Sequence, residues 1–399
     1  MPLLFWISFG GILYTYLGYP AIIWLFSRLA SRDVSRRPIT PRVSVIVPCH
    51  NEETNVISRI ENLKASDYPP EKLEIIVVSD SSSDGTAEAM RRALAQASLP
   101  DGDSGRSDGK RHCEITVLAY RKREGKAAVL NYAIQVATGD VIVFADARQR
   151  FEARAIRELV STLADETVGA VTGELILGDK QRGHIGEAQA LYWKYEKWIR
   201  KNESRFDSSV GASGAIYAIK RQLWDPLPES TILDDAYTPI RISLDGYRIV
   251  FEEKARAYDQ TASRGRQEFL RKARTLTGNY QLCQLLPELL VPSHRLVIQF
   301  YSHKLMRLIA PVLLVAWFTS NAVICIGQGG SGWPALYSGI LIGQTAFYLL
   351  VAAGWVLSGN GLWIRPAKAA YAFMLMNAAA LLGLIYFVTG KQSIWTRTE

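Results

Sequence analysis

The chain has 399 residues, a net charge of +8 and 48% hydrophobic residues, but its charges are unevenly distributed. All but five of its Asp, Glu, Lys and Arg residues lie between residues 28 and 307. This division argues against a single soluble globule, a disordered chain and a repeat array. The composition indicates a polar domain held between membrane segments.

Four apolar segments are long enough to cross a bilayer, which takes roughly 20 residues. They lie at about 3–26, 306–327, 336–357 and 368–390. The first could instead be a secretory signal peptide, but it lacks a basic start and an Ala-x-Ala cleavage site. We therefore expect a retained membrane anchor.

The basic residues beside these segments predict the orientation of the chain. Arg28, Arg32, Arg365 and Lys368 belong on the cytoplasmic side by the positive-inside rule. We expect a multi-pass protein of the inner cell membrane with its catalytic domain, residues 28–305, in the cytoplasm. Counting four crossings puts both termini outside, although Lys391 and Arg397 argue mildly against this for the C-terminus.

Cysteine spacing and charge placement disfavour two other classes of protein. The four cysteines form no C-x-x-C pair and the five histidines show no zinc spacing, so structural zinc and a disulfide framework are not expected. The Lys and Arg residues cluster beside apolar segments and form no aromatic-interleaved stripe. Anionic lipid headgroups, and not nucleic acid, account for the positive charge.

Short β-branched runs alternate with helical patterns in the polar block. The runs are 43–47, 73–78, 115–118 and 141–144, and the helical patterns lie near 54–65, 86–96, 126–137 and 152–164. This order predicts an α/β fold with a mostly parallel sheet covered on both faces. Ligands of such sheets bind beyond the carboxyl ends of the strands. Residues 97–112, rich in Asp, Gly and Ser, are predicted to form a solvated loop.

Charged residues follow the predicted strands. Pro48 to Glu53 follows the first strand, Asp80 to Thr86 the second, and Asp146 the fourth. Alone, the second loop reads as a helix cap and Asp146 as a solvated strand end. Lys126 opens the third helix, where a lysine opposes the helix dipole unless an anion such as a phosphate binds there. Together, these loops predict a nucleotide-sugar site, with carboxylates for the nucleoside and a divalent ion.

These motifs resemble those of the membrane-bound family 2 glycosyltransferases, the inverting GT-A-fold group that includes cellulose, hyaluronan and poly-N-acetylglucosamine synthases. The resemblance covers nearly all of residues 40–310. The matching segments are Pro48 to Glu53 for P-x-x-N-E, Val78 to Thr86 for D-D-G-S-x-D-G-T, Gly125-Lys126 for N-x-G-K, Phe144 to Asp146 for D-x-D, Leu233 to Asp235 for T-E-D, and Arg271 to Thr275 for Q-x-x-R-W. Only the second Asp of D-x-D is present, and the last motif keeps Arg274 but neither the Gln nor the Trp.

The resemblance implies roles for individual residues. The donor-binding set is Pro48, Glu52, Asp80, Lys126, Asp146 and Arg274, and the acceptor side comprises Ser213, Gly214 and Asp234. A divalent metal, Mg²⁺ or Mn²⁺, is expected at Asp146. Asp235 is the expected general base, because burial and a neighbouring carboxylate would raise its pKa. The alternatives are that the aspartates at 234 and 235 only cap the helix over 236–244, and that the small residues of 209–218 form a packed strand.

Two further segments of the chain are predicted to be helical. Residues 264–290 pair basic residues with an apolar face, which predicts a helix in the membrane interface, and His303, Lys304 and Arg307 are expected at the lipid headgroups. The aromatic face of residues 187–202 is expected to serve packing. The predicted regions are an anchor at 1–27, a GT-A domain at 28–263, amphipathic interface helices at 264–304, three transmembrane helices at 305–390 and a tail at 391–399.

The implied function is inverting transfer of a sugar from a nucleotide-diphosphate sugar, with a UDP-sugar favoured, to a membrane-proximal polysaccharide or lipid. The missing Gln and Trp leave polysaccharide biosynthesis and single transfer open. The alternative is a degenerate transferase domain that only binds a nucleotide or a partner. The presence of Asp80, Asp146, Asp235 and Arg274 favours the enzyme.

Overall fold

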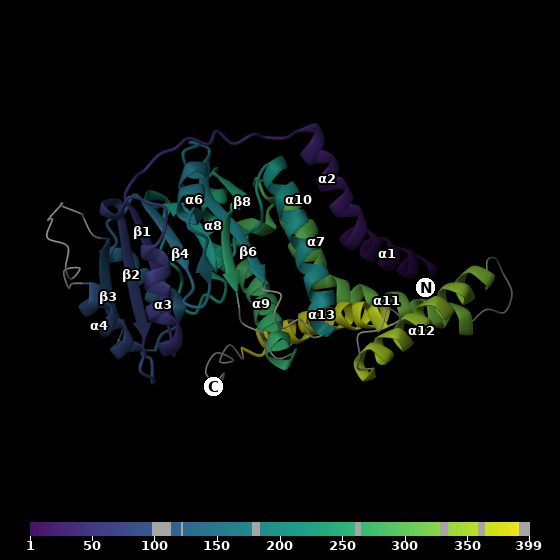
Figure 1. The fold of residues 1–399 in the computed structure, drawn as a ribbon. Coiled ribbons are helices and arrows are strands. Elements are labelled where there is room, and N and C mark those ends of the chain that lie inside the picture. Colours follow the sequence, from purple (N-terminus) through teal and green to yellow (C-terminus); the bar gives the residue numbers. More distant parts are fainter. Residues whose placement is uncertain are drawn as a thin grey trace, which may run out of the picture.

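The computed structural model describes residues 1–97, 113–120, 123–177, 184–259, 265–327, 334–357 and 364–390. An α/β domain with a single sheet lies beside a group of long apolar helices (Figure 1). Most of the predicted solvated loop at 97–112 lies outside the described residues.

The sheet has eight strands in the order β3-β2-β1-β4-β7-β6-β8-β5. Their bounds are β1 Val43–Cys49, β2 Leu73–Asp80, β3 Glu114–Tyr120, β4 Val141–Ala145, β5 Arg150–Phe151, β6 Val168–Leu177, β7 Ile216–Lys220 and β8 Arg248–Asp259. Strands β1 to β4 are parallel to one another, as predicted, and β6 is parallel to β8. Strand β7 runs antiparallel to both β4 and β6, and β5 is antiparallel to β8. The sheet is therefore mixed and mostly parallel, which confirms the predicted fold class.

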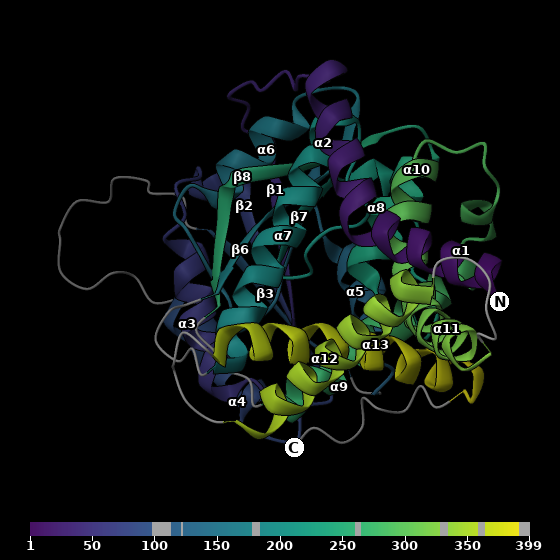
Figure 2. The ribbon, with the colours of Figure 1, turned by 90° about the vertical axis from the view of Figure 1, so that its right-hand side faces the viewer.

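Helices cover both faces of this sheet (Figure 2). They are α3 Glu53–Lys64, α4 Thr86–Ala97, α5 Lys126–Val136, α6 Ala155–Leu163, α7 His184–Phe206, α8 Asp234–Leu244 and α9 Gly265–Leu285. Side chains alternate between the two faces along a strand. In β1, Val43, Val45 and Val47 accordingly pack with α3, α4 and α6, whereas Ile46 packs with α5, α8 and α9. The alternation divides the core into two layers, one on each face of the sheet. Polar loops follow the carboxyl ends of β1, β2 and β4.

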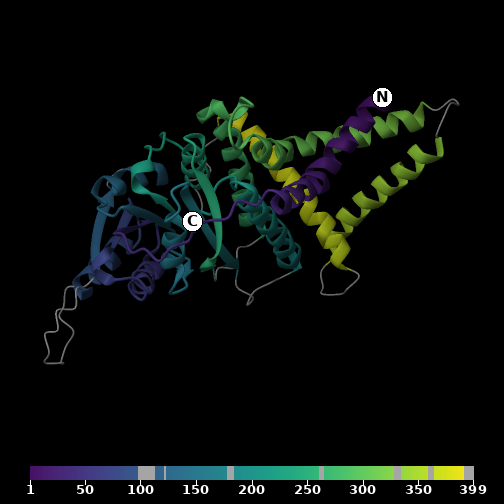
Figure 3. The same ribbon diagram turned by 90° about the horizontal axis from the view of Figure 1, so that it is seen from above.

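Four helical segments are long and apolar enough to cross a membrane, and they match the four predicted spans. They are Pro2–Leu29, Val297–Ile326, Ala335–Val356 and Arg365–Val388. The first comprises α1 Pro2–Leu13 and α2 Tyr19–Leu29 with a π-helical turn between them; the others comprise α10 Val297–Gln299, α11 Met306–Ile326, α12 Pro334–Val356 and α13 Arg365–Val388. These helices lie on the side of the domain away from the β3 edge of the sheet (Figure 3).

The expectation that His303, Lys304 and Arg307 lie at the lipid headgroups is wrong for His303 and Arg307, which have partners inside the protein. His303 is 2% exposed, and its ring nitrogens lie 2.7 Å from a carboxylate oxygen of Glu203 and 3.1 Å from one of Glu196. Arg307 also pairs with Glu196. Two glutamates of α7 thus provide partners inside the protein for both side chains. Lys304 is half-buried beside them.

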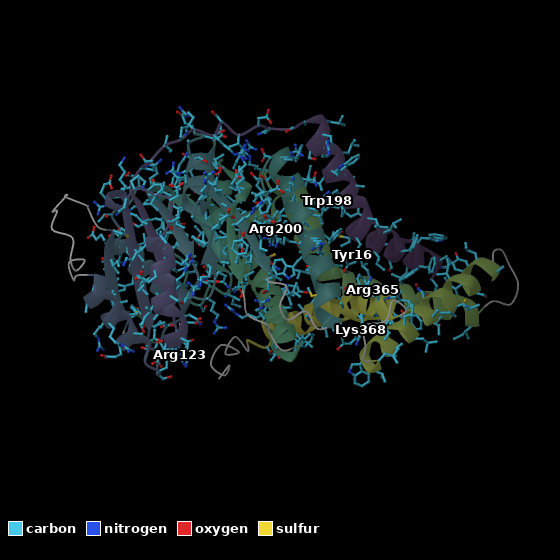
Figure 4. All side chains as sticks on the ribbon, in the orientation of Figure 1. Tyr16, Arg123, Trp198, Arg200, Arg365 and Lys368 are labelled. Atoms are coloured by element: carbon cyan, nitrogen blue, oxygen red, sulfur yellow. The ribbon has the colours of Figure 1, made fainter. Side chains whose placement is uncertain are left out.

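The aromatic face of α7 packs against the first apolar helix, as expected. Tyr195 and the fully buried Ile199 contact the cluster formed with Tyr19 and Ile23. Trp198, labelled in Figure 4, is the exception because it is 40% exposed. The structure thus agrees with a packing role for the residues whose side chains are buried.

Candidate active site

The ammonium group of Lys126 lies among three carboxylates at the carboxyl edge of the sheet. Lys126 begins α5, and its Nζ is 3.3 Å from Asp146 Oδ1, in the loop after β4, and 3.1 Å from Asp234 Oδ2, at the start of α8. Burial acts to lower the pKa of Lys126, but Asp146, Asp234 and Asp235 outweigh it and raise the pKa above its ordinary value. The lysine therefore carries a permanent positive charge in the centre of this group.

Asp235 is held by a backbone donor from the segment before β7. The Gly214 N–H donates a hydrogen bond of 2.8 Å to Asp235 Oδ2. A Cβ atom at position 214 would lie 3.0 Å from that oxygen, so the absence of a side chain permits this close approach. The segment also contains Ser213, whose N–H donates to Thr172 Oγ1 at 2.9 Å. The small residues of 209–218 thus include a direct contact to the predicted base.

The environment of Asp235 favours its protonated form more than water does. Burial raises the pKa of Asp235, the charge of Asp234 raises it further, and Lys126 opposes the rise. Leu233, and not either aspartate, is the N-cap of α8. Both aspartates nevertheless lie in the first turn, where an acidic side chain stabilises the helix. A raised pKa also suits a general base.

Arg274, on α9, lies close enough to the same carboxylates to interact with their charge. Its Nη2 donates to the Ile232 carbonyl oxygen at 3.2 Å. Burial lowers the pKa of Arg274 to about 10, while Asp234, Asp235 and Asp146 act to raise it. The next residue, Thr275, is exposed and donates to the Arg271 carbonyl at 3.0 Å. Arg274 thus contributes to the charged group, whereas the Thr275 hydroxyl binds its own helix.

The remaining predicted donor residues lie along β1 and β2. Asp80 ends β2, and its Oδ1 is buried without a hydrogen-bond partner among the described residues. Burial raises the pKa of Asp80. Glu52 is the N-cap residue of α3, and Pro48 is half-buried in β1, next to β2. Strand β1 also pairs with β4, so the loop after β1 lies next to the loop that carries Asp146.

Arg148 was not predicted as a site residue, but the structure brings it to this edge. Its Nε donates to Glu52 Oε1 at 2.6 Å, joining the loop after β4 to the loop after β1. Its only signal in the sequence is its position two residues after Asp146. The contact explains why Glu52 is buried without leaving an unpaired charge.

A divalent metal fits this site only if the substrate supplies most of its ligands. Among the residues that the structure describes, no group of three or more His, Cys, Asp or Glu could hold a metal ion. The Asp146 side chain is 39% exposed, and its Oδ1 contacts Lys126. Carboxylate oxygen suits Mg²⁺ or Mn²⁺, and such an ion is usually bound by one or two carboxylates together with substrate phosphates. Asp146 fits that arrangement.

Comparison with known proteins identifies a family model and several relatives that this chain resembles. The model of the Glycosyl transferase family 2 matches residues 44–225. The probable glycosyltransferase YdaM of Bacillus subtilis (strain 168) is 26% identical over 60% of this chain and 55% of its own length. A beta-monoglucosyldiacylglycerol synthase of Trichormus variabilis is 24% identical over 61% of this chain and 51% of its own length. The chain thus spans about half the length of the curated relatives it matches.

The likeness to a solved structure extends over the whole fold. The mannosyltransferase PcManGT of Pyrobaculum calidifontis, solved in complex with GDP-Man and Mn²⁺, matches with a TM-score of 0.72 and 22% identity, covering 97% of this chain and 99% of that one. This likeness shows a common GT-A-like fold. The resemblance inferred from the motifs is confirmed, and residues 44–225 of the chain form a family 2 glycosyltransferase domain.

Proposed function

We propose that the chain transfers a sugar, with inversion, from a nucleotide-diphosphate sugar to a polysaccharide or lipid acceptor at the membrane. The observation that carries this proposal is the charged group at the sheet edge. Asp235 is fixed by the Gly214 N–H, while Lys126 and Arg274 provide positive charge beside the same carboxylates. A base and a cationic site for a leaving diphosphate are the two elements that the reaction requires.

In the proposed reaction, Asp235 accepts the proton of the acceptor hydroxyl. The hydroxyl oxygen forms a bond to the anomeric carbon of the sugar as the bond from that carbon to the diphosphate oxygen breaks. Lys126 and Arg274 stabilise the negative charge that develops on the departing diphosphate. When bound, a divalent ion at Asp146 supplies further charge stabilisation for the diphosphate.

Asp80 is proposed to recognise the nucleoside. Its buried Oδ1 has no donor among the described residues, and a buried carboxylate oxygen without a hydrogen bond is unfavourable. An N–H of a uracil-like base or a ribose hydroxyl provides such a donor. A UDP-sugar is the donor we propose, and the comparison with GDP-sugars tests it, because guanine also presents a ring N–H to such an acceptor.

Transfer activity is tested with detergent-purified full-length protein. The protein is incubated with a panel of UDP- and GDP-sugars together with membrane lipids, and the products are identified by mass spectrometry. A glycosylated lipid or polymer formed from one donor supports the proposal. Tight nucleotide binding without any product would instead favour the degenerate, binding-only domain.

Arg274→Ala is expected to reduce transfer strongly, whereas Thr275→Ala has little effect. Arg274 lies near the three carboxylates, while Thr275 is exposed and its hydroxyl donates to the Arg271 carbonyl of its own helix. Losing a charge-assisted contact to a diphosphate costs about 1.5–3 kcal/mol, which corresponds to roughly 10- to 100-fold in kcat/KM. Steady-state rates of the two variants provide the measurement, with exposed Arg271→Ala as the matched control. Equal losses of kcat/KM in Arg274→Ala and Thr275→Ala would contradict the assignment of this motif.

We also propose that the four apolar helices span the inner membrane and that the catalytic domain is cytoplasmic. In a protein without its native cysteines, a single cysteine at exposed Gly390 is expected to react with a membrane-impermeant maleimide in intact cells. Labelling that requires permeabilised cells would mean that one of the four helices does not cross the membrane.

A further inference from the structure

Helix α9 binds the segment that leads into α8 and the proposed base. Gln281 of α9 is 4% exposed. Its Oε1 accepts a hydrogen bond from the Ile232 N–H at 2.9 Å, and its Nε2 donates to the Ser230 carbonyl at 3.1 Å. Residues 230–233 form neither helix nor strand. One buried side chain therefore satisfies two backbone groups that no secondary structure satisfies.

Two further residues on the same side of α9 hold this segment. Gly278 lies directly against Leu233, because a Cβ atom at position 278 would be 2.4 Å from Leu233 Cγ. Arg274 donates to the Ile232 carbonyl. Residues 274, 278 and 281 follow the i, i+4, i+7 spacing of a single helix face. The face is thus shaped to fit the backbone immediately before Asp234 and Asp235.

The segment needs such support because its backbone is unfavourable at one residue. Ser230 has φ of +63°, in the left-handed region that residues other than glycine rarely occupy. Such a conformation persists when surrounding contacts fix it. The hydrogen bond from Gln281 Nε2 to the Ser230 carbonyl is one of these contacts.

Other residues of α9 bind the apolar helix α13. Thr277 Oγ1 donates to the Gly383 carbonyl at 3.2 Å, and the ring of Tyr280 stacks on that of Phe387 at 5.8 Å between centroids. A Cβ atom at position 383 would lie 3.0 Å from the Ala273 carbonyl oxygen and from the Thr277 nitrogen. The two backbones therefore meet at a point where only glycine fits without displacement.

We propose that Gln281 and Gly383 are positioning residues for Asp235. Helix α13 sets the place of α9 through Gly383, and α9 sets the place of the base through Gln281. The apolar helices would then determine the geometry of the reaction as well as anchor the domain. This inference rests on the proposed role of Asp235 as the general base.

The first test is Gln281→Ala in the full-length protein, compared with Gln284→Ala, which alters an exposed residue of the same helix. A displacement of about 1 Å at a catalytic group costs up to about 10²-fold in rate. We expect kcat to fall about 10- to 100-fold in Gln281→Ala while the donor KM changes by less than about twofold. The control should match the unaltered protein. A purely structural role would lower nucleotide affinity and the melting temperature without this separation of kcat from KM.

The second test is Gly383→Ala, compared with Gly343→Ala on α12, where an added Cβ would meet nothing within 4 Å. We expect kcat to fall in Gly383→Ala but not in Gly343→Ala. This comparison still tests the proposal if Gln281→Ala does not fold. Full activity of Gln281→Ala, or equal activity of the two glycine variants, would overturn the inference. If the unaltered protein transfers no sugar from any donor, the proposed function itself fails and the inference with it.

Discussion

Asp235→Asn is expected to lower kcat by about 10²- to 10⁴-fold, the usual contribution of a positioned base. Asparagine has nearly the same shape, and its side-chain oxygen can still accept the Gly214 N–H that now donates to Asp235 Oδ2 at 2.8 Å. It cannot take the proton from the acceptor hydroxyl. Nucleotide binding should survive, because Asp80 and Lys126 are unchanged. Turnover with the identified donor and a separate nucleotide titration provide the two measurements.

The pH dependence of the unaltered protein offers a second readout. Burial and Asp234 raise the pKa of Asp235, so the base is protonated at a pH where an ordinary aspartate, with a pKa of about 3.9, is still ionised. Activity is therefore full above the raised pKa and falls as the pH drops through it. The residual rate of Asp235→Asn should lack this acid limb.

The matched control for this variant is Asp245→Asn, at the other end of the same helix. The Asp245 side chain is 50% exposed and its contact to Arg241 is long, at 3.8 Å. Exposed pairs of this kind contribute about 0–1 kcal/mol to stability. The control should retain normal turnover and the normal pH profile. Near-normal turnover of Asp235→Asn itself would remove Asp235 from the role of base.

The half of the fold around β1 to β4 could be predicted because its signals are local. Each strand is a β-branched run, the residues of β1, β2 and β4 alternate between two buried faces, and β1, β2 and β3 are each followed directly by a helix of ordinary length. The other half could not be predicted. Strand β7 is inserted between β4 and β6, so its neighbours are far from it in sequence, and β5 has only two residues. No local pattern specifies such pairings.

The candidate site could be predicted as a set of residues but not as a set of contacts. Asp235 and Gly214 are 21 residues apart, and their hydrogen bond depends on where β7 and α8 pack. The error at His303 has the same origin, because its partner Glu203 is 100 residues away on α7. From sequence alone, a basic residue beside an apolar segment is expected at lipid headgroups. Only the tertiary structure shows that the buried carboxylate of Glu203 lies 2.7 Å from His303 Nδ1.

Removal of divalent metal is expected to abolish transfer, and Asp146→Ala should reproduce that loss. Asp146 alone stands at the position of the metal-binding motif, and the described residues contain no metal-binding cluster of three or more His, Cys, Asp or Glu. Metal stabilisation of a developing charge amounts to several kcal/mol, so the loss in rate should reach at least about 10²-fold. The rate is measured in excess chelator and again after Mg²⁺ or Mn²⁺ is restored.

The two perturbations should not add, because they remove the same interaction. Chelator should therefore lower the rate of the unaltered protein but leave the residual rate of Asp146→Ala unchanged. Asp140→Ala is the matched control: it alters an exposed aspartate just before the amino end of β4, whereas Asp146 follows the carboxyl end. That variant should stay active and stay sensitive to chelator. Full activity of the unaltered protein in excess chelator would refute the metal assignment, and the diphosphate charge would then be stabilised by Lys126 and Arg274 alone.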